Sequence, residues 1–158
     1  MSEAKRIRLL RAIAFAAGAL WAAPNTALGL VAGAAALAFG AKPRWHPGAR
    51  ALVFQRFPWG PGGALTLGNV ILHTGASLDV GCRTYAHRAG ECEEPAISLA
   101  AHEHAHVLQY MALGPLFLPL YLACGGVGAR NPFERAADRY AQTGRGWWPW
   151  APTNGRAD

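Results

Sequence analysis

The chain opens with a long apolar run. It covers residues 12–41 and is interrupted only at 24–26, where a Pro-Asn-Thr segment would end one helix and begin the next. This pattern predicts two helical arms of roughly sixteen residues, each slightly short of the about twenty needed to span a bilayer. Gly29 and Gly33 have the small-xxx-small spacing that allows close helix packing, so we interpret the run as a membrane hairpin. A single pass, a buried soluble hairpin and a removed signal peptide are the alternatives.

Two shorter apolar segments follow, at 51–57 and 64–74. Both have the length and composition of β-strands. The segment between them, 58–63, is rich in proline and glycine and is typical of a turn. We therefore expect a short β hairpin before the next helical pattern.

The second half of the chain has the pattern of helices. One is predicted within 94–114, with Pro95 at its first position and Gly114-Pro115 as its stop signal. Another is predicted within 131–140, a segment that begins with an Asn-Pro pair. Between them, 114–128 is apolar but broken by prolines and glycines, which predicts an interfacial or buried helix too short to span.

Composition changes this picture by pointing to a membrane. The chain has 158 residues, enough for one modest core, and is 52% hydrophobic but only 15% charged. The last segment, 147–158, begins with three tryptophans within four residues, and tryptophan favours the headgroup zone of a bilayer.

The charge pattern favours an anionic lipid surface over nucleic acid. The net charge is +6, and basic residues gather on both sides of the apolar run rather than among aromatic residues. Under the positive-inside rule, both ends of a hairpin are then cytoplasmic. A single pass would put the rest of the chain on the other side. The basic residues in question are Lys5, Arg6, Arg8, Arg11, Lys42, Arg44, Arg50 and Arg56.

The three cysteines do not have the spacing of a metal site. Cys82 and Cys92 lie ten residues apart in a predicted loop, and Cys124 lies in an apolar segment. The first two could form a disulfide in an oxidising compartment, whereas free thiols are expected in the cytoplasm.

The chemistry of the chain is concentrated in a His-Glu-His-Ala-His sequence at 102–106. His102 and His106 are four residues apart, so on a helix they share one face and can reach one ion, with Glu103 beside them to handle water. His104 projects about 200° away from His102 and is expected to serve packing or the surface. A solvated polar helix face is the alternative interpretation.

A second acidic pair lies downstream on the other predicted helix. Glu134 and Asp138 are also four residues apart and share a face. Surface ion pairs with neighbouring arginines are the alternative for these two carboxylates.

The two motifs together resemble the gluzincin branch of the zincin metallopeptidases, over roughly residues 65–141. The resemblance implies Zn²⁺ bound by His102, His106 and Glu134, with Glu103 as the general base. It also implies that Asp138 accepts the free N–H of His102. Tyr140 and Tyr121 are candidates for stabilising the transition state by residue type only. In zincins a strand borders the cleft and holds the substrate backbone, and the predicted β segment could serve that role.

The middle of the chain is also similar to small bacterial membrane proteins that have a zincin-like core. We therefore expect an α+β fold: a membrane helical hairpin, then a minimal zincin-like core of a β hairpin, the motif helix and a second helix with Glu and Asp. The expected units are 1–45, membrane-embedded, 46–146, zincin-like, and 147–158, the Trp-rich tail.

The sequence thus predicts an integral protein of the bacterial inner membrane with its catalytic part on the cytoplasmic side. Its predicted activity is zinc-dependent hydrolysis of peptide bonds, and its expected partners are the lipid bilayer and a peptide or protein substrate, with no nucleic acid. The alternative is a non-catalytic membrane adaptor or assembly protein with a structural or degenerate metal site.

Overall fold

The computed structural model describes residues 1–151 of the chain. Residues 152–158 of the predicted tail lie outside the described part. The elements, in chain order, are α1 (Glu3–Trp21), α2 (Ala23–Leu37), β1 (Lys42–His46), β2 (Ala51–Gln55), β3 (Ala64–Leu67), β4 (Val70–His73), β5 (Gly81–Cys82), α3 (Tyr85–Arg88), β6 (Ile97–Ser98), α4 (Leu99–Leu113), the 3₁₀ turn η1 (Gly114–Leu116), α5 (Phe117–Ala123) and α6 (Pro132–Thr143).

The fold is α+β, as predicted, and is built on a four-stranded mixed sheet with the order β1-β2-β4-β3. The predicted hairpin between 51–57 and 64–74 is wrong, because β2 pairs with β4 in parallel. The hairpin is formed instead by β3 and β4, which are antiparallel and joined at Gly68-Asn69. Gly68 has a φ of +63°, and a Cβ there would lie 2.2 Å from Oγ1 of Thr26 on α2. A tight turn pressed against a helix therefore divides the 64–74 run into two strands.

The predicted antiparallel membrane hairpin is replaced by a bent pair of helices. The axes of α1 and α2 bend by 69° at the break between them. Gly29 and Gly33 pack against the sheet rather than against α1, since added Cβ atoms would meet Val70 and Phe54. The apolar run therefore covers one face of the sheet with its second arm.

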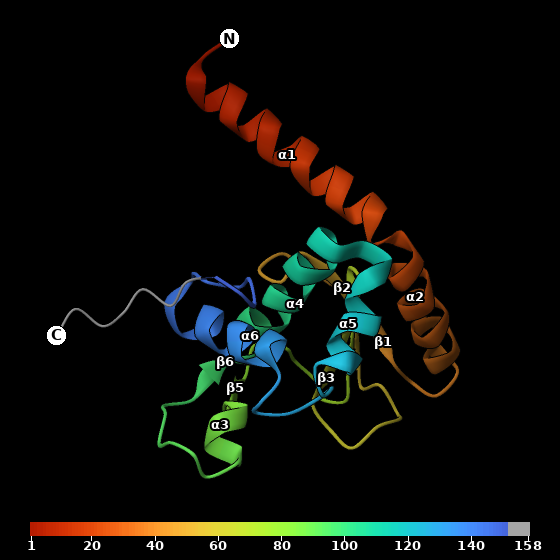
Figure 1. Cartoon of the computed structure of the whole chain (residues 1–158). Helices are drawn as coiled ribbons and strands as arrows, with labels where there is room; N and C mark the ends of the chain where they lie inside the picture. Colours follow the sequence, from red (N-terminus) through yellow and green to blue (C-terminus); the bar gives the residue numbers. More distant parts are fainter. Residues whose placement is uncertain (152–158) are drawn as a thin grey trace, which may run out of the picture.

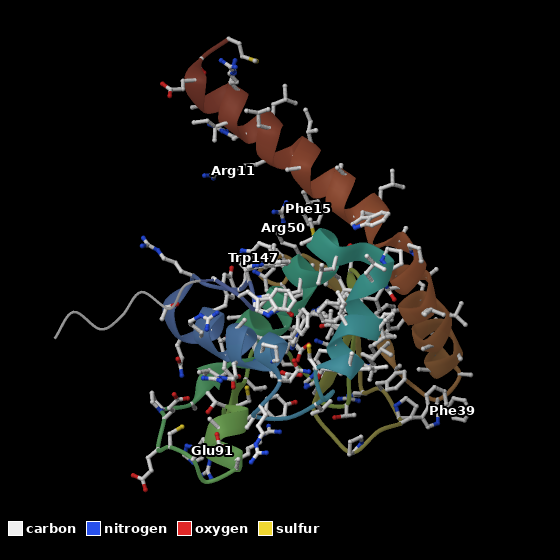
Figure 2. All side chains as sticks on the ribbon, viewed as in Figure 1. Arg11, Phe15, Phe39, Arg50, Glu91 and Trp147 are labelled. Carbon is white, nitrogen blue, oxygen red and sulfur yellow. The ribbon has the colours of Figure 1, made fainter. Side chains whose placement is uncertain are left out.

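The first arm projects away from the rest of the protein (Figure 1). Helix α1 has no buried residue and contacts the body only near its C-terminal end. Gly18 packs on Met111 of α4, and the guanidinium of Arg50 lies 3.8 Å from the ring centroid of Phe15 (Figure 2). The first contact attaches an otherwise exposed apolar helix to α4, which carries the His-Glu-His-Ala-His sequence, and the second attaches it to the turn before β2.

Two segments of residues 1–151 are long and apolar enough to cross a membrane: the bent pair taken as one span, and Leu99–Ala123. The second segment contains α4, η1 and α5. Helix α4 contributes nine buried residues, whereas α5 contributes only Phe117. Length and composition support membrane association only weakly, because core helices of soluble proteins have the same properties.

Helix α4 begins four residues later than the sequence predicted. The segment Ile97–Ser98 pairs with β5 as a strand, so Pro95 precedes the helix rather than starting it. The side chain of Ser98 caps the helix by accepting a hydrogen bond from the backbone N–H of Ala101. All three cysteines are free thiols. The division of the chain into units at residues 45 and 146 stays a prediction.

Candidate metal centre

Helix α4 presents the two histidines of the motif inside the protein. His102 and His106 are one helical turn apart and only 5% and 7% exposed. The opposite side of the same helix packs into the hydrophobic core through Val107 and Ala100. The interpretation of the motif as a solvated helix face is therefore wrong.

Helix α6 brings the two downstream carboxylates to the same place. Asn131 caps this helix by accepting a hydrogen bond from the N–H of Phe133. The amide of Asn131 also donates to the carbonyl oxygens of Tyr121 and Gly126, which fixes the start of the helix relative to the preceding loop. Glu134 and Asp138 are consequently buried, at 2% and 8% exposure, and are not surface ion pairs with arginines.

Three atoms converge to form a group that could hold a metal ion. Nε2 of His102 lies 3.1 Å from Oε2 of Glu134 and 3.2 Å from Nε2 of His106. The third side of this triangle, from Nε2 of His106 to Oε2 of Glu134, is 3.3 Å. The nearly equal sides place the three atoms around one common position.

The other ring nitrogen of each histidine is held by a polar partner. Nδ1 of His102 lies 2.9 Å from Oδ1 of Asp138, and the second oxygen of Asp138 accepts a hydrogen bond from the N–H of Tyr85. Nδ1 of His106 lies 2.8 Å from Oε1 of Gln109. Since these acceptors favour a proton on Nδ1, Nε2 of each ring is left to bind an ion.

Gln109 contacts the candidate site and was not predicted from the sequence. Its amide group donates to the carbonyl oxygens of Phe133 and Trp147, so its oxygen is fixed toward His106. The available signal was a polar residue three positions after His106 in an apolar part of the helix. Its full burial could not be deduced from that position.

Charges in the group stabilise one another in the absence of an ion. Burial opposes protonation of His102, but its hydrogen bonds to Asp138 and Glu134 outweigh burial and raise its pKa to about 10. The pKa of His106 is also raised, because attraction to Glu134 outweighs burial. Burial likewise opposes ionisation of Glu134, yet the two histidines hold its pKa well below the usual range. The group is thus a carboxylate with protonated imidazole beside it.

Glu103 lies next to the triad, on the wall of a pocket. It is 4% exposed, and its Oε2 accepts a hydrogen bond of 2.6 Å from the hydroxyl of Thr66 on β3. Thr66 was not predicted as a site residue, because a single threonine in an apolar strand gives no signal of a partner 37 residues away. The pocket is lined by both histidines, Glu103 and Glu134, together with Thr66, Phe117 and Tyr121.

The two candidate tyrosines occupy different places. The hydroxyl of Tyr121 donates a hydrogen bond to Oε1 of Glu134 and lines the pocket. Burial raises the pKa of Tyr121 above its usual range, so it keeps its proton. The hydroxyl of Tyr140 lies 3.1 Å from Nδ1 of His104 and lines a separate hollow on the other side of α4. The structure therefore brings Tyr121, and not Tyr140, to the triad.

No known protein family, curated protein or solved structure matches this chain. The likeness to gluzincins rests on the spacing of the two motifs and on the geometry of the residues that they bring together.

Proposed function

We propose that this protein is a membrane-associated, zinc-dependent metallopeptidase. The observation that carries the proposal is the buried triangle formed by His102, His106 and Glu134. Two imidazoles and one carboxylate are the ligand set of a catalytic zinc site, in which a fourth position stays open.

The size of the triangle fits zinc. Ligand bonds of about 2.0–2.1 Å in tetrahedral geometry separate neighbouring ligand atoms by roughly 3.3 Å. The observed separations of 3.1, 3.2 and 3.3 Å agree with that value. A zinc ion bound there would supply a Lewis acid that activates water toward a peptide carbonyl.

The roles of the surrounding residues follow from their contacts. Glu103 takes a proton from the attacking water and delivers it to the leaving amine. Thr66 fixes Oε2 of this carboxylate, which leaves Oε1 for the proton transfer. Asp138 and Gln109 hold the histidine rings in place. Tyr121 is the better placed of the two candidate tyrosines for stabilising negative charge on the substrate, since it lines the pocket.

Strand β3 offers a surface for the substrate backbone. It is the last strand of the sheet, so one of its edges is not paired with another strand of the sheet. Ala64, Leu65 and Thr66 of this strand line the pocket beside the triad. A peptide in extended conformation could add to this edge and pass the zinc site.

Membrane association is supported by α1 and α2. Helix α1 exposes apolar side chains around its axis, including Leu9, Leu10, Ile13 and Leu20. Four basic residues lie in the first half of α1, as expected for a helix that binds an anionic membrane surface. We extend the proposal to a bacterial inner membrane with the metal centre on the cytoplasmic side. The basic residues before and after the apolar run favour this side if the bent pair lies on the membrane surface and does not cross the bilayer as one span.

Elemental analysis of the detergent-purified protein tests the proposal. We expect about one zinc per chain in the wild type. Glu134→Ala should lose the metal, because one of three ligands is removed. Glu103→Gln should keep the metal but fail to cleave a denatured protein substrate that the wild type cleaves. Cleavage by purified Glu103→Gln protein would refute the role of Glu103.

A different result would favour the alternative function. Wild-type protein that binds zinc firmly but cleaves no substrate would indicate a structural site in a membrane adaptor or assembly protein. Wild-type protein that binds no zinc after metal loading would exclude both the enzyme and the structural zinc site.

A further inference from the structure

A second pocket adjoins the first one at the candidate metal centre. Ala64, Tyr85, His102 and Glu103 line both this pocket and the pocket described above. The two hollows therefore meet at Glu103 and the first histidine of the triad. A chain that lies across the centre would extend from one hollow into the other.

The two pockets differ in chemistry. The first is also lined by Phe117, Leu118, Tyr121 and Val127, so it suits an apolar side chain. The second is lined by Arg83 and Arg88, which come from the segment around the short helix α3. It thus presents positive charge within the same cleft.

Neither guanidinium forms an ion pair with a carboxylate within residues 1–151. Every ion pair in this part of the chain joins a carboxylate to a histidine. Arg88 lies over the ring of Tyr85, with its Cζ 5.4 Å from the ring centroid. Glu94, one of the acidic residues that follow α3, accepts a hydrogen bond from the amide group of Gln142. Both arginines are exposed and thus available to a ligand.

An extended peptide connects the two observations. Successive side chains of an extended chain point to opposite sides and advance by about 3.3 Å per residue. A peptide lying along β3 therefore directs neighbouring side chains toward different walls of the cleft. Arginine binds a carboxylate through paired, charge-assisted hydrogen bonds. A peptide with lysine or an amide side chain in place of the carboxylate could not form these bonds.

We propose that the cleft selects peptides with an apolar side chain on one side of the cleaved bond and an acidic side chain on the other, with Arg83 and Arg88 as the residues that determine the acidic specificity. This inference rests on the proposed peptidase function for the position of the cleaved bond. It concerns the substrate class and not the hydrolytic step.

Binding to a variant that does not turn over the substrate tests the inference. Zinc-loaded Glu103→Gln protein is titrated with labelled hexapeptides that differ at one central position, Leu-Glu against Leu-Lys, and with the reversed pairs Glu-Leu and Lys-Leu. Of the two glutamate peptides, Leu-Glu and Glu-Leu, we expect the one that binds more tightly to bind at least about tenfold more tightly than the matching lysine peptide. The double change Arg83→Glu/Arg88→Glu, in the same background, should abolish or invert this preference.

A matched variant controls for net charge. Lys42→Glu/Arg44→Glu makes the same charge change on β1, at the opposite edge of the sheet, where both side chains are exposed. It should keep the preference for glutamate. Equal affinity for glutamate and lysine peptides, no binding of either, or the same loss in both double variants would overturn the inference.

The design separates this inference from the proposed function. If the wild type cleaves a denatured protein but the inactive variant shows no charge preference, the peptidase stands and the acidic specificity is wrong. If the preference is present but the wild type hydrolyses nothing, Arg83 and Arg88 form a peptide-binding site in a protein that is not a peptidase.

Discussion

Each of the two histidines is oriented by a different polar residue. Asp138 approaches His102 from α6, whereas Gln109 lies on α4, three residues after His106. Gln109 is in turn held by carbonyl oxygens of Phe133 and Trp147. Buried polar groups of this kind are costly unless they are all satisfied, so the arrangement specifies one geometry for the ligands.

The protonation of His102 predicts how metal binding depends on pH. Its pKa in the metal-free protein is raised to about 10, above the ordinary value of 6.5, so a proton occupies the ring throughout the neutral range. Because zinc and this proton compete for Nε2, zinc affinity should rise by about tenfold per pH unit between pH 7 and 9. Titration with a competing chelator at several pH values measures this change in zinc affinity. An affinity independent of pH would contradict the raised pKa.

The raised pKa of His102 also predicts that the stability of the metal-free protein falls as pH rises, opposite to the trend in zinc affinity. A raised folded-state pKa contributes stability that is fully present below the unfolded value and is lost as pH rises through the folded value. For His102 this window runs from 6.5 to about 10. Melting temperatures in a chelator should therefore fall across that window, whereas those in excess zinc should not show this loss.

The site residues that sequence could supply are those with a fixed spacing along a helix. His102, His106 and Glu103 follow from one turn of helix, and Glu134 with Asp138 from another, because side chains at i and i+4 share a face. Thr66 and Gln109 have no such spacing to their partners. Their roles depend on how β3 and the start of α6 approach α4, and that approach is a property of the folded chain.

At the scale of elements, α2 determines how the N-terminal run is used. Its glycines at 29 and 33 allow the helix to lie directly on the sheet, and Asn25 donates a buried hydrogen bond to the carbonyl oxygen of Gly114 at the end of α4. This helix therefore connects the sheet with the helix that carries the two histidines of the candidate metal centre.

Gly33→Leu tests that packing. A Cβ at this position would lie 2.3 Å from ring atoms of Phe54, so the ring or the helix must move. We expect a loss of about 1–3 kcal/mol in the free energy of unfolding, typical of overpacking. Urea denaturation measures it. Ala34→Leu, at an exposed neighbouring position, is the control and should change stability much less.

The predicted hairpin and the observed bent pair differ for a physical reason. Apolar composition and small-residue spacing describe a surface that packs closely, but they do not specify the partner. In this chain the partner of α2 is the sheet, through Val70 and Phe54, rather than α1. Similarly, the two strand segments were identified from their composition. Their parallel pairing could not be predicted in the same way, because the turn at Gly68 lies inside one apolar run.

At the scale of the whole molecule, α1 is the element that contributes no buried residue to the core. It is exposed along its length and combines apolar side chains with four basic residues. The three core clusters are formed by the other elements, although α2 and α5 also expose apolar side chains such as Val31 and Leu122. A surface of this kind is expected to bind a bilayer that carries negative charge.

Charge reversal on α1 tests this expectation. Changing Arg8 and Arg11 to glutamate should weaken binding to vesicles that contain anionic lipid by about 30-fold or more, at roughly 1 kcal/mol per basic residue removed. Co-sedimentation with vesicles measures the binding. Arg130→Glu/Arg135→Glu makes the same charge change far along the chain and should leave binding nearly unaffected. Equal losses in both variants would indicate a general charge effect.

The contact between Gln109 and Trp147 has an optical consequence. Gln109 joins His106 of the candidate metal centre to the backbone of a segment whose indole rings contact one another in sequence, namely Trp147, Trp148 and Trp150. Trp150 also packs edge-on against Phe133, the neighbour of Glu134 on α6. Occupation of the centre therefore restrains this indole cluster from two sides, so intrinsic fluorescence should report metal occupancy without any label.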